Sequence, residues 1–163
     1  MKILGHRHTG IIVQNLDKML EFYIGLGLEL RIRNVERGPF IYHLLNNKNI
    51  VLETAKLILN DESVSIKHRF QLELMMIKAN KSNVKKSLLE KILSKFDLNN
   101  QPLGILDIAF TVDDIKAVIE YIDSNGGDII SKPMEAAVGF PALHSYARDP
   151  EGNVLHLAQN LTA

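Results

Sequence analysis

The chain has 163 residues, of which 46% are hydrophobic, so it can form one compact domain or two small halves packed together. Its 19 basic and 19 acidic residues cancel, and no basic excess points to nucleic acid or to an anionic membrane. The chain has no cysteine, no apolar run near the ~20 residues of a membrane span and no signal-peptide pattern, so we expect a cytoplasmic protein whose metal ligands could only be nitrogen and oxygen.

The first half of the chain is expected to form a strand, a helix and three further strands. Asn15 is a suitable N-cap for that helix, and Gly25 and Gly27 end it. The alternation of apolar and charged residues over 28–33 predicts a half-buried strand, whereas 38–47 is expected to be a short helix or a loop. The expected strands lie at residues 7–13, 28–33, 49–59 and 69–77, with a turn at 61–63.

An amphipathic helix is expected at 82–96, between the two halves, as a linker that covers apolar surface; a lid or a dimer contact is the alternative. We therefore expect a first module at 1–78, a linker at 79–103 and a second module at 104–163. The second module is expected to begin its helix at Asp113 or Asp114 and to end it at Asn125. Its expected strands are 105–112, 128–132, 142–148 and 153–159, with a loop at 133–141 and a hairpin turn at 149–153.

The beginning of the chain recurs in register 99 residues later. Residues 8–13 align with 107–112, and Leu72-Glu73-Leu74 corresponds to Leu155-His156-Leu157 near the end of each half. A duplicated unit folds into two similar halves, and the interface between them is a natural place for a site. We predict an α+β fold of two βαβββ repeats that form a curved, mostly antiparallel sheet cup with helices packed outside.

The four matched positions of the repeat are all occupied by residue types that bind metals: His8, Glu73, Asp107 and His156. Side chains alternate along a strand, and in three of the four strands the bulky residues lie on the face opposite the ionisable one. This pattern is typical of a cup with a charged centre. Isolated ionisable residues on strands are more often surface positions, however, so alternation leaves both interpretations open.

The chain resembles the vicinal oxygen chelate superfamily, which includes glyoxalase I, methylmalonyl-CoA epimerase, fosfomycin-resistance thiol transferases, extradiol dioxygenases and bleomycin-resistance proteins. The resemblance covers nearly the whole chain and is specific for the fold, but this fold hosts many activities. The segments that show it are His8–Tyr23, Leu26–Leu28, Leu72–Leu74, Ile108–Asp114 and Arg148–Leu157.

The resemblance implies one divalent metal held by His8, Glu73, Asp107 and His156. In the family the four ligands are usually His, then Glu or Gln, then His, then Glu. Here position 107 has a carboxylate and position 156 an imidazole, so the last two types are exchanged, and the total of two histidines and two carboxylates is kept. Such a set suits Zn, Ni, Co, Mn or Fe(II). The resemblance also implies a homodimer and a small-molecule substrate that His144 and Tyr146 contact; surface positions are the alternative for these two residues.

The expected activity is that of a lyase or isomerase that moves a proton next to a carbonyl, with Glu73 as the proton mover and Asp107 as the other candidate. An extradiol dioxygenase using His8, Asp107 and His156 is one alternative. A metal-free ligand-binding protein of the bleomycin-resistance type is another. Glyoxalase I-like enzymes commonly place Arg and Asn where this chain has Ile12 and Ile77, which argues against a glutathione adduct as substrate.

Overall fold

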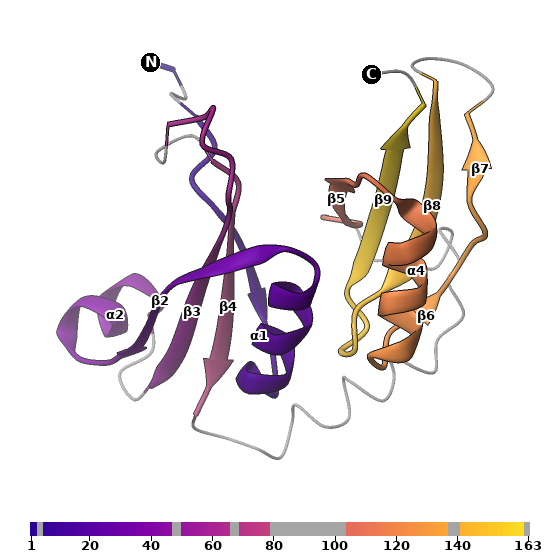
Figure 1. Cartoon of the computed structure of the whole chain (residues 1–163). Helices are drawn as coiled ribbons and strands as arrows, with labels where there is room; N and C mark the ends of the chain where they lie inside the picture. Colours follow the sequence, from indigo (N-terminus) through magenta and orange to yellow (C-terminus); the bar gives the residue numbers. More distant parts are fainter. Residues whose placement is uncertain (3–4, 47–49, 66–68, 79–103, 137–140, 162–163) are drawn as a thin grey trace. The chain divides into compact units, whose positions relative to one another are not determined.

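A computed structural model describes residues 1–2, 5–46, 50–65, 69–78, 104–136 and 141–161 (Figure 1). The chain forms two compact units, Met1–Lys85 and Lys86–Ala163. The helix predicted at 82–96 lies outside the described residues, and the module boundaries at 78 and 104 stay a prediction.

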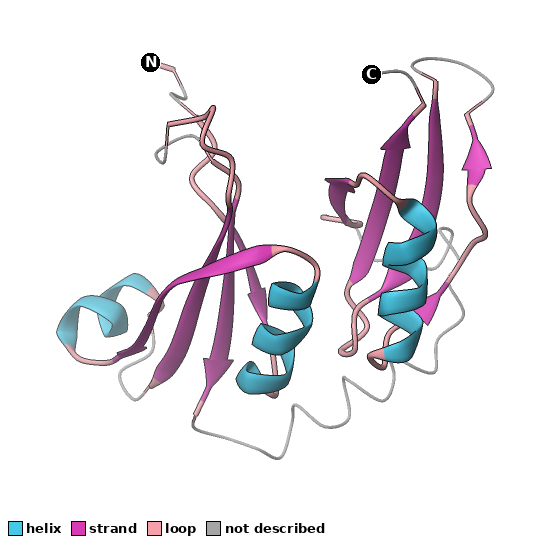
Figure 2. Ribbon diagram, in the orientation of Figure 1, coloured by secondary structure: helices cyan, strands magenta, loops and turns pink. Residues whose placement is uncertain are grey.

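The first unit is a mixed four-stranded sheet with a helix on one face. Its elements are β1 (Thr9–Ile12), α1 (Leu16–Gly25), β2 (Leu28–Glu36), α2 (Pro39–Leu44), β3 (Leu52–Leu59) and β4 (Gln71–Ile77). The strands lie in the order β1-β4-β3-β2, and only β1 and β4 pair in parallel. Helix α1 packs against β2, β3 and β4 (Figure 2).

Local sequence signals account for α1. The Asn15 side chain accepts a hydrogen bond from the Lys18 backbone N–H at 3.1 Å, as predicted for an N-cap. Gly27 then adopts a φ of 96°, a conformation that only glycine reaches without strain, and the chain turns into β2. The apolar stripe of the helix is buried, at Leu16, Met19, Leu20, Phe22 and Tyr23. The strands β3 and β4, which α1 contacts, have buried leucines at 57, 72 and 74.

Strand β2 differs from its prediction. It runs on to Glu36, and among its residues only Leu28 is buried, so the expected half-buried alternation is wrong. The reason is its place at the edge of the sheet and a β-bulge between Leu30 and Ile32, which breaks the alternation of faces. The segment 38–47, left open between a helix and a loop, contains the short helix α2.

The second unit repeats this plan. Its elements are β5 (Ile108–Thr111), α4 (Ile115–Ser124), β6 (Asp128–Ile129), β7 (Met134–Glu135), β8 (Ala142–Arg148) and β9 (Val154–Asn160). Strand β5 pairs in parallel with β9, and the other pairings are antiparallel. The expected loop at 133–141 contains the two-residue strand β7 on β8, because so short a strand shows no alternation in the sequence.

The duplication predicted from the sequence is therefore a structural repeat. The helix caps Asn15 and Asp114 are 99 residues apart, as are Gly27 and Gly126, which both have positive φ. The α+β class of the prediction is confirmed by two mixed sheets with few helices. Among the helices of the described residues, none is long and apolar enough to cross a membrane.

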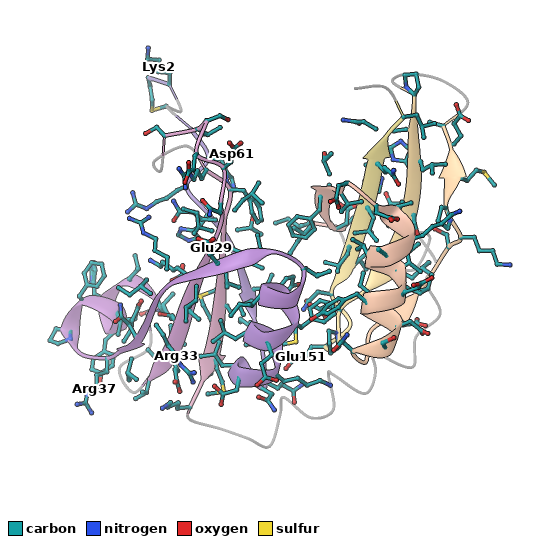
Figure 3. All side chains as sticks on the ribbon, viewed as in Figure 1. Lys2, Glu29, Arg33, Arg37, Asp61 and Glu151 are labelled. Atoms are coloured by element: carbon teal, nitrogen blue, oxygen red, sulfur yellow. The ribbon has the colours of Figure 1, made fainter. Side chains whose placement is uncertain are left out.

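An ion-pair network ties the outer strand of the first unit to its neighbours. The guanidinium of Arg33 on β2, which Figure 3 labels, contacts Asp17 of α1 at 2.6 Å and Glu53 of β3 at 2.6 Å. The Lys78 ammonium reaches the other oxygen of Glu53 at 2.8 Å. Lys78, and after it Arg33, lower the pKa of Glu53 below its ordinary value.

This network predicts how stability depends on pH. Because its folded-state pKa is lowered, Glu53 stabilises the fold above its unfolded pKa of about 4.3, and this contribution is lost as pH falls through the folded pKa. Glu53→Gln should therefore lower the free energy of unfolding by about 1 kcal/mol near neutral pH, with the difference vanishing in acid. Urea titrations between pH 3 and 7 measure it, and Glu62→Gln at an exposed turn is the control. A deficit that is independent of pH would contradict the prediction.

Candidate functional site

Parallel pairing in the first unit brings two of the predicted site residues together. Gly10 of β1 lies opposite Glu73 of β4, and His8 shares the face of Gly10 because it is two residues away. The His8 Nε2 atom lies 3.2 Å from the Glu73 Oε2 atom. Glu73 is only 7% exposed, so its carboxylate is held in the protein rather than in bulk water. This pair forms the first half of the candidate site.

Lys56 is a member of this half-site that the sequence did not reveal. It lies opposite Glu73 in the β3–β4 ladder, and its Nζ atom is 3.4 Å from Glu73 Oε1. A buried carboxylate is costly without a compensating charge, and Lys56 supplies one. A lysine between Ala55 and Leu57 in a largely apolar strand indicates a charged partner nearby, but only the pairing register identifies that partner as Glu73.

The second unit gathers the other four predicted residues. Asp107 directly precedes β5, and His156 lies on β9 opposite Ala109. Tyr146 of β8 pairs with His156, and their rings stack with centroids 4.7 Å apart. His144, two residues before Tyr146, shares this face, and its Nδ1 atom lies 2.9 Å from His156 Nε2. One imidazole of that pair must donate the hydrogen and the other accept it.

Tyr146 also links the two candidate ligands of the second unit. Burial raises the pKa of the Tyr146 phenol, and the charge of Asp107 and a hydrogen bond to it raise the pKa further. The phenol is therefore protonated at neutral pH and donates its hydrogen bond to the Asp107 carboxylate. His156 and Asp107 are thus both in contact with the same side chain.

Each unit accordingly supplies one imidazole and one carboxylate, one from the residue just before its first strand and one from its last strand. This donor set of nitrogen and oxygen fits a divalent first-row metal. Within the described ranges, no group of three or more His, Cys, Asp or Glu side chains is placed to hold a metal ion. The structure therefore brings the predicted residues together within each unit, and convergence of all four stays a prediction.

A cavity of about 580 Å³ in the first unit adjoins the His8–Glu73 pair. Both residues that contact Glu73, His8 and Lys56, are part of its wall. Four more of the lining residues were not predicted from the sequence, and three of them lie on β2 and β4, which reach the cavity only through pairing across the sheet. The lining residues are Arg7, His8, Arg31, Ile32, Lys56 and Gln71.

Comparison with known proteins identifies a family that the chain matches over most of its length. A family model described as Glyoxalase/Bleomycin resistance protein/Dioxygenase superfamily matches residues 5–157. No curated protein matches the chain.

Solved structures share the fold at low sequence identity. A glyoxalase family protein from Bacillus cereus has a TM-score of 0.78 at 21% identity, over 99% of this chain and 97% of that one. A glyoxalase family protein from Enterococcus faecalis has a TM-score of 0.56 at 19% identity, over 97% of this chain and 99% of that one. A glyoxalase I mutant from Zea mays has a TM-score of 0.58 at 21% identity, over 94% of this chain but only 44% of its own.

The contact between Asp107 and Tyr146 predicts that the pKa of the Tyr146 phenol depends on the charge of residue 107. Asp107→Asn should lower the pKa of Tyr146 because it removes the negative charge beside the phenol, while burial still holds the pKa above its ordinary value. Ultraviolet absorbance titration of the four tyrosines measures the change, and Tyr146→Phe identifies which transition belongs to this residue. A Tyr146 pKa that is unchanged in the Asn variant would contradict the contact.

Proposed function

Because this chain belongs to the Glyoxalase/Bleomycin resistance protein/Dioxygenase superfamily, we propose that it is a metal-dependent lyase or isomerase that moves a proton next to a carbonyl group. The observation that supports the proposal is the repeated register. Gly10 pairs with Glu73 and Ala109 pairs with His156, so each unit presents one imidazole and one carboxylate at equivalent positions. A small oxygenated molecule as substrate and a homodimer belong to the same proposal.

His8, Glu73, Asp107 and His156 would hold the metal. A bound divalent ion polarises the oxygen atoms of a substrate and stabilises the negative charge that develops when a neighbouring carbon loses a proton. The distance of 3.2 Å between His8 and Glu73 supports the fit, because it places two donor groups side by side, one just before β1 and one on the adjacent strand β4. Two histidines and two carboxylates, without thiolates, match the preference of such ions.

Glu73 is the residue we assign to proton transfer. Its oxygens lie at 3.2 and 3.4 Å from His8 and Lys56, in charge contacts that an entering substrate can displace. Asp107, the other candidate, accepts a hydrogen bond from the Tyr146 phenol. Glu73 would take the proton from the carbon beside the carbonyl and return it to the neighbouring carbon or to the opposite face, so that no proton is gained or lost overall.

A second candidate function is metal-free ligand binding. It is favoured because each residue proposed to ligate the metal already has a polar partner in the protein. His8 and Lys56 contact Glu73, Tyr146 contacts Asp107, and His144 contacts His156. A site whose polar groups all have hydrogen-bond or charge partners is stable without a metal ion. Metal content separates the two functions.

Elemental analysis tests the metal. Protein purified without chelator or affinity-tag metal should contain about one equivalent of Zn, Ni, Co, Mn or Fe per chain, because one shared site has four donors. The double variant Asp107→Ala, His156→Ala should lose it, whereas the control His43→Ala, Asp123→Ala, at two exposed positions, should keep it. Iron together with oxygen uptake on catechols would instead favour a dioxygenase. Protein that stays metal-free after divalent metals are added back would contradict the proposal and favour the binding function.

The role of Lys56 gives a second test. Its ammonium competes with a metal for the charge of Glu73, so Lys56→Met should tighten metal binding by about tenfold. Competition with a chromophoric chelator measures the affinity. Lys78→Met is the matched control, because Lys78 pairs with Glu53 instead. Weaker binding in the Lys56 variant would show that the lysine supports the site rather than competing for it.

A further inference from the structure

The cavity beside Glu73 has an unbalanced positive charge. Of the six residues that line it, Arg7, Arg31 and Lys56 are permanent cations, and no carboxylate belongs to the described lining. Its remaining polar groups, the His8 ring and the Gln71 amide, can donate hydrogen bonds. Ile32 is its apolar residue. This composition suits an anion that carries oxygen acceptors.

The β-bulge in β2 builds one wall of the cavity. Leu30 pairs with Leu57, and Ile32 pairs with the next residue of β3, Lys56, so Arg31 is the extra residue. In an unbroken strand, neighbouring residues face opposite sides of the sheet. Here both Arg31 and Ile32 line the cavity, because the bulge redirects one of them. The guanidinium is thus brought to the cavity by a specific irregularity of the backbone.

Two of the three cations have no counter-charge among the residues that the structure describes. Lys56 is paired with Glu73, but neither Arg7 nor Arg31 forms an ion pair with another described residue. In the same strand Arg33 is fully engaged by Asp17 and Glu53, so the lack of a partner at Arg31 is not general to β2. One guanidinium group can donate two parallel hydrogen bonds to two oxygens of a carboxylate or a phosphate.

We infer that this cavity binds the oxyanion of the substrate, a carboxylate or a phosphate, through Arg31 and Arg7. The assignment to a substrate rests on the proposed function, and the binding itself does not. His8 and Lys56 belong both to the cavity wall and to the surroundings of Glu73, so an anion held here lies one side chain away from the proposed base. The substrate class is therefore a small acid that carries a carbonyl at one end and its anionic group at the other.

Calorimetric titration of the whole chain in chelator, with inorganic phosphate in one arm and malonate in the other, tests the inference. We expect at least one of these probes to bind and Arg31→Gln to weaken that binding by about tenfold or more. Tighter binding of phosphate points to a phosphate ester, and tighter binding of malonate points to a carboxylate. Arg37→Gln is the matched control, since Arg37, which Figure 3 labels, is exposed, follows the same strand and is not among the residues that line the cavity.

The two proposals can fail separately. Because the titration uses metal-free protein, anion binding that depends on Arg31 supports the inference even if the chain binds no metal. Absence of binding by both probes, or equal weakening in the Arg31 and Arg37 variants, overturns the inference and leaves the metal proposal intact. Circular dichroism of the variants shows that the comparison is between folded proteins.

Discussion

The parallel pairing between the first and last strands of each repeat is the constraint on which the candidate site depends. In the first unit it sets Gly10 beside Glu73, and in the second it sets Ala109 beside His156. A slip of one residue would turn every side chain of the strand to the other face, and Glu73 would exchange places with buried Leu72 or Leu74. The register of these ladders therefore determines whether the site exists.

Burial of Glu73 organises the charges around it. The carboxylate is almost removed from water, and His8 and Lys56 approach its two oxygens from neighbouring strands. In the second unit Tyr146 takes the position in the ladder that Lys56 has in the first, and it lies opposite His156 instead of a carboxylate. The two units thus differ in the charge of matched residues while they share the same order of strands and helix. The cavity lined by Arg7, Arg31 and Lys56 lies in the first unit, which has the lysine.

Local signals allowed the sequence to predict part of this structure. Asn15, Asp114 and the glycines at 27 and 126 act within a few residues, so the helices and the repeat could be read directly. Lys56, Arg31 and the hydrogen bond from Tyr146 to Asp107 depend on pairing between distant strands or on a bulge, which no local pattern reveals. The exposure of β2 has the same origin, because an edge position is a property of the whole sheet.

X-ray absorption spectroscopy of the zinc-loaded protein tests whether residues of both repeats bind the same metal ion, as we propose. We expect two imidazole ligands, of which His8→Ala and His156→Ala each remove one, whereas His144→Ala leaves both in place. Two imidazoles that persist in His8→Ala would place them both in the second unit, at His144 and His156. That result would contradict a site built from equivalent positions of the two repeats.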